Sequence, residues 1–153
     1  MDAIFKKLNF KNQTDLLVLN APVNFESKLS SLDGVMVHNN FDHIGDLCFS
    51  LAFAMTQNEI NEIAKELIVK IKGDAILWFA YPKRTSKKYK SDISRDNGWS
   101  VLGEAGFEAV RQIAIDEDWS ALRFRRVEFI KSIARELKRA LSLKGRARAL
   151  ISK

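Results

Sequence analysis

Residues 47–80, with the sequence LCFSLAFAM-TQNE-INEIAKELIVKIKGD-AILWFA, contain the strongest structural signals of the chain. The first nine and the last six of these residues are nearly unbroken apolar runs, as in strands that are covered on both faces of a parallel sheet. Thr56 and Glu59 have the spacing of a capping box, which predicts a helix start, and Gly73 is expected to end that helix. One apolar stripe follows the helical repeat: Ile60, Ile63, Ala64, Leu67, Ile68 and Ile71. The segment is therefore predicted to be a strand, a helix and a parallel strand.

Shorter elements flank this unit on both sides. Apolar runs at 16–19 and 35–37 predict two more strands, and a run at 110–115 predicts another that is buried on both faces. Residues 119–125 alternate between apolar and polar side chains, which predicts a half-exposed antiparallel strand at a sheet edge. Further helices are expected at 2–8, from Pro22 to about Leu32, and at 92–105. The alternation predicts a Rossmann-like, three-layer α/β fold with a mostly parallel sheet, a C-terminal antiparallel hairpin and a basic C-terminal helix.

The positive charge is concentrated at the C-terminus. The formal charge of the chain is +6, whereas residues 126–153 carry nine Lys or Arg against two Glu, a net +7. We therefore expect a single α/β domain over residues 1–125 and a basic helical tail over residues 126–153. An amphipathic basic helix can contact a polyanion or a protein partner, or can pack on its own domain with its charges in water.

Length and composition restrict the class of protein. A chain of 153 residues with 46% hydrophobic and 29% charged residues suits one globular domain. No apolar run reaches the roughly 18 residues of a membrane span, and the first residues do not resemble a signal peptide. The single cysteine, Cys48, offers no disulfide framework and predicts a reducing, cytoplasmic location. A thiol within an apolar run is expected to be packed in the core.

A ligand is expected where the parallel strands end. In open α/β sheets ligands bind beyond the carboxyl ends of the strands, which selects residues 20–22, Thr56, 81–95 and 116–119. Aromatic side chains there offer stacking surface, and basic side chains offer charge for an anionic small molecule. The candidate ligand-binding residues are Asn20, Thr56, Tyr81, Lys83, Arg84, Arg95, Trp99, Trp119 and Arg123. The alternative is structural: Asp116, Glu117 and Asp118 pair with the basic loop while the tryptophans fill the core.

Other chemical signals are weak. The polar stretch 38–43 with Asp46 contains His, Asp and Asn, but its spacing matches no zinc motif and predicts a loop. Ser120 follows no nucleophile elbow, and both histidines precede the central strand. The chain contains neither a phosphate-binding P-loop nor a G-x-G-x-x-G motif. No catalytic or metal-binding residue is predicted.

Three motifs carry a resemblance. They are LWFAYPK at 77–83, DISRD at 92–96 followed by Gly98-Trp99, and DWSALRFR at 118–125. Together they resemble a group of small bacterial proteins classified as a domain of unknown function, over about residues 15–125. The Pro-Lys and Trp-Ser-x-x-Arg pieces are the most specific. This resemblance implies a small Rossmann-like sheet and no particular activity.

A looser likeness involves residues 102–110, LGEAGFEAV, which are similar to the helix-to-strand passage late in S-adenosylmethionine-dependent methyltransferases. It implies a shortened methyltransferase fold. That family needs a glycine-rich loop after its first strand and an acidic residue after its second. Here the corresponding residues are Asn20-Ala21-Pro22 and His38-Asn39-Asn40, and both departures argue against the family's usual mode of cofactor binding.

Three functional hypotheses follow. The first is a non-catalytic binding or regulatory module with an anionic ligand at the carboxyl edge of the sheet. The second is a divergent transferase-like enzyme that uses an anionic or nucleotide-type cofactor. The third is sequence-independent nucleic-acid binding through residues 126–153, which would depend strongly on salt.

Overall fold

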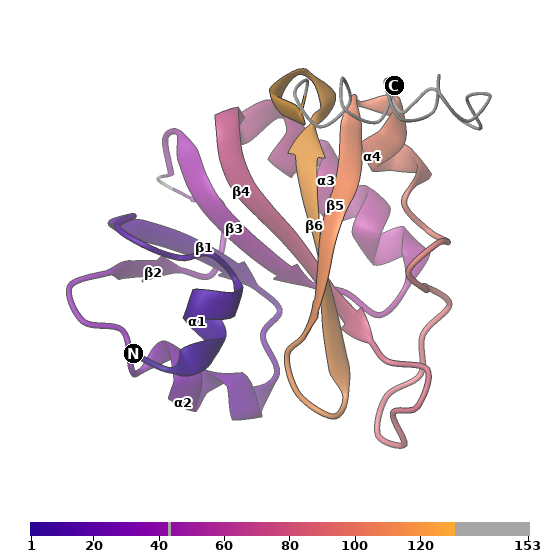
Figure 1. Ribbon diagram of the computed structural model, residues 1–153, viewed down its shortest axis with the longest axis horizontal. Coiled ribbons are helices and arrows are strands. Elements are labelled where there is room, and N and C mark those ends of the chain that lie inside the picture. The colour runs from indigo at the N-terminus through magenta and orange to yellow at the C-terminus, as the bar shows by residue number, and fades with distance from the viewer. Residues whose placement is uncertain (43, 131–153) are drawn as a thin grey trace, which may run out of the picture.

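The computed structural model describes residues 1–42 and 44–130, and within them six strands form one sheet in the order β2-β1-β3-β4-β6-β5 (Figure 1). The strands are β1 (Asp15–Leu19), β2 (Met36–His38), β3 (Leu47–Phe53), β4 (Ile71–Pro82), β5 (Phe107–Ala114) and β6 (Trp119–Arg126). The helices are α1 (Ala3–Lys7), α2 (Glu26–Leu29), α3 (Gln57–Lys70) and α4 (Ser100–Glu104), with 3-10 turns at Val23–Phe25 and Val127–Ile130.

The sheet has the predicted mixed topology. β1, β2, β3 and β4 run parallel to one another, whereas β6 is antiparallel to both β4 and β5. The chain passes from β1 out to β2 on one side, then returns to β3 on the other side of β1 and continues to β4. The strand order therefore reverses between β1 and β3, as in Rossmann-like sheets. The predicted mostly parallel α/β fold with an antiparallel hairpin is confirmed.

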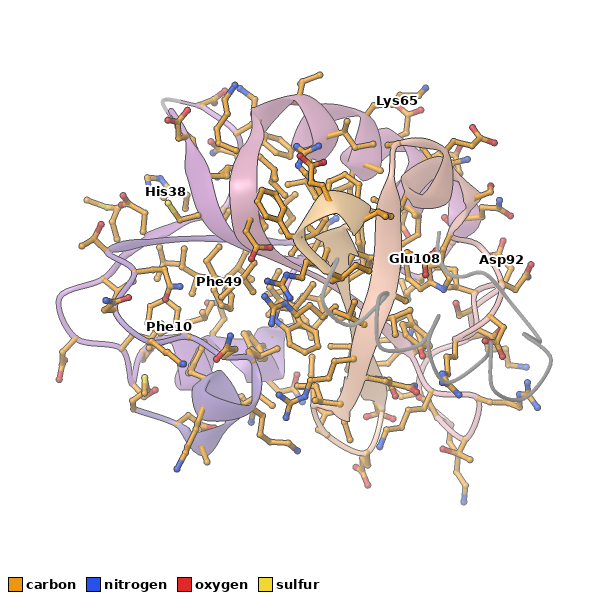
Figure 2. All side chains as sticks on the ribbon, turned by 45° about the horizontal axis from the view of Figure 1, so that its top comes forward. Phe10, His38, Phe49, Lys65, Asp92 and Glu108 are labelled. Atoms are coloured by element: carbon orange, nitrogen blue, oxygen red, sulfur yellow. The ribbon has the colours of Figure 1, made fainter. Side chains whose placement is uncertain are left out.

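Helices cover both faces of the sheet and make three layers (Figure 1). α1 and α2 pack on one face, where Phe10 and Phe49 meet edge to face with ring centroids 5.2 Å apart (Figure 2). Trp78 on β4 is fully buried in this layer, and its indole Nε1 donates to the backbone carbonyl of Leu8 at 2.9 Å. α3 and α4 cover the other face through residues such as Leu67 and Leu102.

The start of α3 is set by its own sequence. The backbone N–H of Glu59 donates to Thr56 Oγ1 at 3.1 Å, and Glu59 Oε1 accepts from the Thr56 N–H at 3.0 Å. This is the predicted capping box. At the N-terminus, Asp2 caps α1 in a similar way by accepting from the Ile4 N–H at 2.9 Å.

We expect Thr56→Ala to lower the free energy of unfolding by about 1 kcal/mol, because it leaves a helix N–H without its acceptor. In thermal denaturation this corresponds to a melting temperature about 3 °C lower. Asn58→Ala, which changes an exposed residue of the same helix turn and keeps the box, is the control. Equal melting temperatures for the two variants would contradict the role of the box.

Two predictions about the ends of α3 and β4 are wrong. The helix ends at Lys70, and Gly73 lies inside β4 with φ +56°. Ile71 is already extended and buried against Leu47, so strand pairing begins before the glycine, and the register then shifts between Leu47 and Phe49. Gly73 thus permits an irregular backbone conformation within β4, and it does not end the helix.

The predicted places of the two hairpin strands are exchanged. The sequence predicts that β5 is buried, but it is the edge strand and exposes residues 109–112, while β6 lies inside the sheet between β4 and β5. Both faces of β6 are covered, as the buried Ala121 and Leu122 show. The alternation at 119–125 is misleading because the arginines on one face are partly buried rather than in solvent.

Other local predictions need smaller corrections. The expected helix at 22–32 is a 3-10 turn followed by the short α2, and the helix expected at 92–105 is only α4. β2 begins one residue later than predicted. Cys48, expected in the core, is exposed, because it lies on β3 at the site of the register shift.

The C-terminal prediction is only partly within the described residues. Arg126 belongs to β6, and Ile130 is buried, so these residues are part of the folded unit. The helix expected further along falls on residues 131–153, which lie outside the described residues. Within the described ranges, no helix has the length and apolar character that a bilayer crossing requires.

Candidate functional site: a basic pocket at the end of β4

A pocket of about 800 Å³ lies where β4 ends. The chain from Tyr81 to Asn97 forms most of its wall, and β5 and β6 contribute Gln112 and Ser120. Tyr81 and Pro82 are the last residues of β4, so the pocket lies at the carboxyl edge of the parallel strands. This is the edge at which open α/β sheets bind ligands.

The loop that walls the pocket is held by its neighbours at both ends. Near its start, the Lys83 N–H donates to the carbonyl of Asp118 at 2.8 Å, and Ser86 Oγ donates to Asp118 Oδ1 at 2.7 Å. Further along, Ser91 Oγ donates to the Met55 carbonyl at 2.8 Å, and the Gln57 N–H donates to Asp92 Oδ1 at 2.8 Å. The loop is thus tied to the β5–β6 turn and to the start of α3.

The pocket is strongly positive. Lys83, Arg84, Lys90 and Arg95 line it against a single carboxylate, that of Asp92, which already accepts a backbone N–H. The ion pairs among residues 1–42 and 44–130 involve none of these four cations. Within these ranges, the acidic residues 116–118 also form no ion pair with the basic loop, contrary to the structural alternative. Instead, Asp118 orders the loop by accepting hydrogen bonds: its carboxylate accepts from the Ser86 hydroxyl, and its backbone carbonyl accepts from the Lys83 N–H.

Tyr81 presents a phenol to the pocket. Gln112 Nε2 donates to the Tyr81 Oη at 2.8 Å. Burial raises the pKa of Tyr81 above its ordinary value of 10.0, while the positive charge of Arg95 and the Gln112 hydrogen bond act in the opposite direction. The phenol is therefore neutral at physiological pH, and its hydroxyl can still donate to a ligand oxygen.

Alkaline titration should detect the environment of Tyr81. The folded protein favours the protonated phenol of Tyr81, so the contribution of this group to stability is present below pH 10 and is lost as the pH rises through the raised pKa of the folded state. When tyrosinate absorbance is followed during the alkaline titration, we expect a late step, at a pH above the ordinary tyrosine pKa, that Tyr81→Phe removes. Since the chain has two tyrosines, Tyr89→Phe is the matched control and should retain the late step. A late step that persists in Tyr81→Phe would contradict this assignment.

Of the two predicted tryptophans, Trp119 lies in the core and Trp99 is partly buried against it. Trp119 is buried against Phe53 and Tyr89, at ring-centroid distances of 5.0 and 5.1 Å. Trp99 packs on the other face against Tyr81, and its Nε1 donates to the Ser94 carbonyl at 2.8 Å. Neither lines the pocket. These positions agree with the alternative in which the tryptophans pack with the core, and they do not agree with tryptophans that stack on a ligand.

Three other candidates also lie outside the pocket. Asn20 Nδ2 donates to the Phe53 carbonyl at 3.4 Å and so bridges the ends of β1 and β3. Thr56 is used by the capping box. Arg123 pairs in register with Trp78, on the sheet face opposite Tyr81. Of the nine candidates, the pocket brings together Tyr81, Lys83, Arg84 and Arg95.

Two pocket residues, Gln112 and Ser120, were not among the ligand-binding residues predicted from the sequence. A β-bulge between Ala109 and Arg111 sets the register that places Gln112 opposite Leu122, on the Tyr81 face of the sheet. The polar residues within 108–112 were the available signal, because they mark β5 as an edge strand. The bulge itself leaves no clear trace in the sequence.

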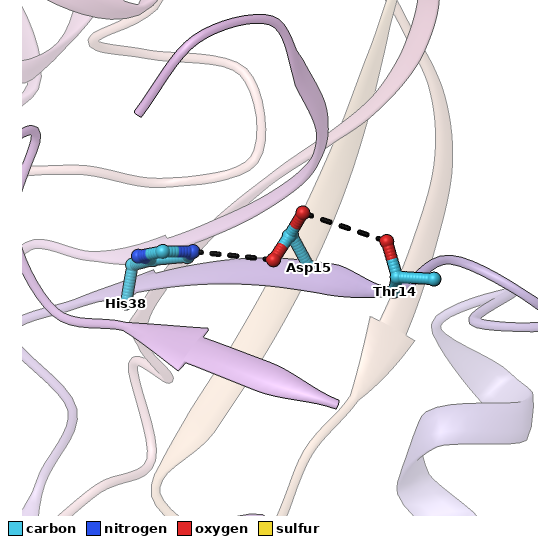
Figure 3. A network of polar contacts seen from close by, with 3 residues as sticks. All are labelled: Thr14, Asp15 and His38. Atoms are coloured by element: carbon cyan, nitrogen blue, oxygen red, sulfur yellow. Dashed lines mark hydrogen bonds and ion pairs between the residues drawn. The ribbon is translucent and has the colours of Figure 1, made fainter. Parts of the chain in front are cut away.

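The polar stretch after β2 is separate from this site. His38 Nε2 lies 3.4 Å from Asp15 Oδ1, whose other oxygen is 3.5 Å from Thr14 Oγ1 (Figure 3). His38 and Asp92 are on opposite sides of the molecule (Figure 2). Among residues 1–42 and 44–130, no three His, Cys, Asp or Glu side chains are grouped to hold a metal ion.

The crevice between β1 and β3 is where a nucleotide-type cofactor would bind in this fold. Asn20 takes a left-handed conformation there, with φ +59°, and its side chain contacts the Phe53 carbonyl. This position therefore carries a side chain where the methyltransferase pattern has bare backbone. The residues at this edge do not fit the glycine-loop mode of cofactor binding.

Comparisons with known proteins support the fold. An S-adenosylmethionine-dependent methyltransferase from Aquifex aeolicus superposes with a TM-score of 0.54 at 13% identity, covering 79% of this chain and 86% of that one. The N-methyltransferase NodS from Bradyrhizobium japonicum gives 0.50 at 10% identity, covering 81% and 93%. A ribosomal protein methylase from Lactobacillus delbrueckii gives 0.50 at 12% identity, covering 80% and 74%.

Sequence identities this low establish a shared fold, and they carry no statement about activity or ligand. No protein-family description matches the chain, and no curated protein is similar to it in sequence. The loose methyltransferase likeness of the sequence is confirmed at the level of the fold.

Proposed function

We propose that this protein binds a small organic anion, carrying a phosphate or carboxylate group, in the pocket at the end of β4. The observation that carries the proposal is the group of four cations there, which the described residues leave without an ion pair. Guanidinium and ammonium groups bind such anions through charge-assisted hydrogen bonds. Tyr81, Gln112 and Ser120 supply neutral polar contacts for the rest of the ligand.

A thermal-shift panel tests this proposal. The panel should contain inorganic phosphate, sugar phosphates, nucleoside monophosphates, dicarboxylates and S-adenosylmethionine. A ligand at one hundred times its dissociation constant should stabilise the fold by about 2.7 kcal/mol, which raises the melting temperature by several degrees. If no anion in the panel stabilises the protein beyond the effect of matched ionic strength, the proposal fails.

A second candidate is a divergent transferase, which the shared methyltransferase fold favours over the purely non-catalytic interpretation. In this version the anion in the pocket is the acceptor substrate or the cofactor. The departures at Asn20 and His38 predict that S-adenosylmethionine, if it binds, uses contacts other than a glycine loop.

Calorimetric titration and transfer of a radiolabelled methyl group separate the two versions. Binding of S-adenosylmethionine with label transfer to a pocket ligand supports the transferase. Anion binding without S-adenosylmethionine binding supports the non-catalytic module.

A further inference from the structure

The hydroxyl of Ser120 makes no contribution to the hydrogen bonding of the fold. Ser120 is 8% exposed, yet it lines the β4 pocket, and its Oγ has no hydrogen-bond partner within residues 1–42 and 44–130. Ser86 and Ser91 also line the pocket, but their hydroxyls hold the loop by donating to Asp118 and to the Met55 carbonyl. Because buried polar groups are normally hydrogen-bonded, an unpartnered hydroxyl that opens into a pocket points to a partner supplied by a ligand.

Ser120 belongs to a group of neutral polar side chains on three neighbouring strands. It is the direct register partner of Tyr81, and Gln112 on β5 lies on the same face of the sheet. The Cβ atoms of residues paired in this way are roughly 4.5–5.5 Å apart, so one ligand can reach both hydroxyls. Gln112 Nε2 donates to the Tyr81 Oη at 2.8 Å, which leaves the phenol proton and the Gln112 Oε1 available. We call these three side chains the strand wall.

The cations of the pocket come from a different part of the chain. Those of the lining all belong to the loop after β4, namely Lys83, Arg84, Lys90 and Arg95, whereas the strand wall is neutral. An ionised phosphate only accepts hydrogen bonds, so it offers nothing to the carbonyl oxygen of Gln112. A hydroxyl both donates and accepts, and therefore complements every side chain of the strand wall. The two walls together suit a ligand with an anionic end and a neutral, hydroxylated end.

We propose that the pocket binds a sugar phosphate, with the phosphate among the loop cations and the sugar hydroxyls on the strand wall. This proposal rests on the proposed function and specifies its ligand class. A phosphate monoester carries about −1.5 to −2 charge at pH 7 and three acceptor oxygens, which suits several cations better than a single carboxylate does. A nucleobase would need a free aromatic face, but each of the two tyrosine rings in the lining already packs against a tryptophan, at ring-centroid distances of 5.7 and 5.1 Å.

Calorimetric titration of the full chain with inorganic phosphate, ribose 5-phosphate, glucose 6-phosphate and adenosine monophosphate tests this proposal. One of the two sugar phosphates should bind about tenfold more tightly than inorganic phosphate, because it adds hydrogen bonds to the strand wall. Ser120→Ala should weaken binding of that sugar phosphate about 3- to 10-fold and leave the affinity for inorganic phosphate unchanged. Tyr81→Phe should act in the same direction. Ser100→Ala removes an exposed hydroxyl on α4 outside the pocket and should change neither affinity.

Thermal denaturation of the free protein separates a ligand contact from a structural role of Ser120. Ser120→Ala removes no hydrogen bond among the described residues, so this variant should melt no lower than the wild-type protein. A lower melting temperature would show that the hydroxyl serves the fold, and the argument for a ligand contact would be overturned.

The binding results distinguish this proposal from the proposed function. Binding of inorganic phosphate or a dicarboxylate, without tighter binding of either sugar phosphate, overturns the sugar phosphate and leaves the anion pocket standing. Equal losses of both affinities in Ser120→Ala have the same meaning. Tighter binding of adenosine monophosphate than of ribose 5-phosphate, which lacks the base, would show that a base is recognised and would also overturn it. If no anion binds at all, both proposals fail.

Discussion

Replacing Trp78 by alanine is expected to lower the free energy of unfolding by about 3–5 kcal/mol, the largest stability loss predicted for this protein. Trp78 is fully buried on β4, between β3 and β6, so its removal leaves a cavity among residues of two neighbouring strands. The change also deprives the Leu8 carbonyl of its indole donor. Because domains of this size are stable by about 5–15 kcal/mol, such a loss is a large fraction of the total.

Urea denaturation followed by far-ultraviolet circular dichroism measures this effect. The control is Val69→Ala, which shortens a side chain that is 69% exposed on α3 and should change stability little. A loss below about 1 kcal/mol for Trp78→Ala would show that the layer between α1 and the sheet does not have the close packing described above.

The second large effect concerns the pocket and rests on the proposed function. Lys83→Gln combined with Arg95→Gln should weaken binding of the anion found in the thermal-shift panel by at least about 100-fold, because the variant lacks two charge-assisted hydrogen bonds, each worth about 1.5–3 kcal/mol. In thermal denaturation, the stabilisation that the anion gives the wild-type protein should nearly disappear at the same ligand concentration.

The matched control removes the same charge from exposed residues outside the pocket. Lys87→Gln combined with Lys65→Gln changes one exposed residue of the same loop and one of α3, neither of which lines the pocket. This variant should keep the wild-type affinity apart from a small, salt-dependent reduction. If both double variants lose affinity equally, the ligand senses only the overall charge and not the pocket.

The bulge in β5 also shapes the pocket. The single bulge in β5 determines that Gln112 lies on the Tyr81 face and that Arg111 lies on the Arg123 face. Bulges are frequent beside functional sites because they redirect side chains. The contact of Gln112 with the Tyr81 hydroxyl in the pocket therefore depends on this local irregularity.

Elements with local signals could be predicted from the order of the amino acids. Continuous apolar runs beginning near Leu16, Leu47 and Ala75 predicted parallel strands, because strands covered on both faces lack polar alternation. The capping box at Thr56 predicted the start of α3, because its two hydrogen bonds join residues only three apart. The rule that ligands bind at carboxyl ends selected the residues after β4, and four of the nine candidates do line one pocket there.

The identity of the edge strand and the side chains that meet across the sheet depended on long-range packing. β6 lies between β4 and β5 because its two faces pack into both core layers, and this is a property of distant partners. The bulge that places Gln112 in the pocket depends on pairing between strands. Pairing and burial arise from residues far apart in the chain, and a local pattern of apolar and polar residues does not record them.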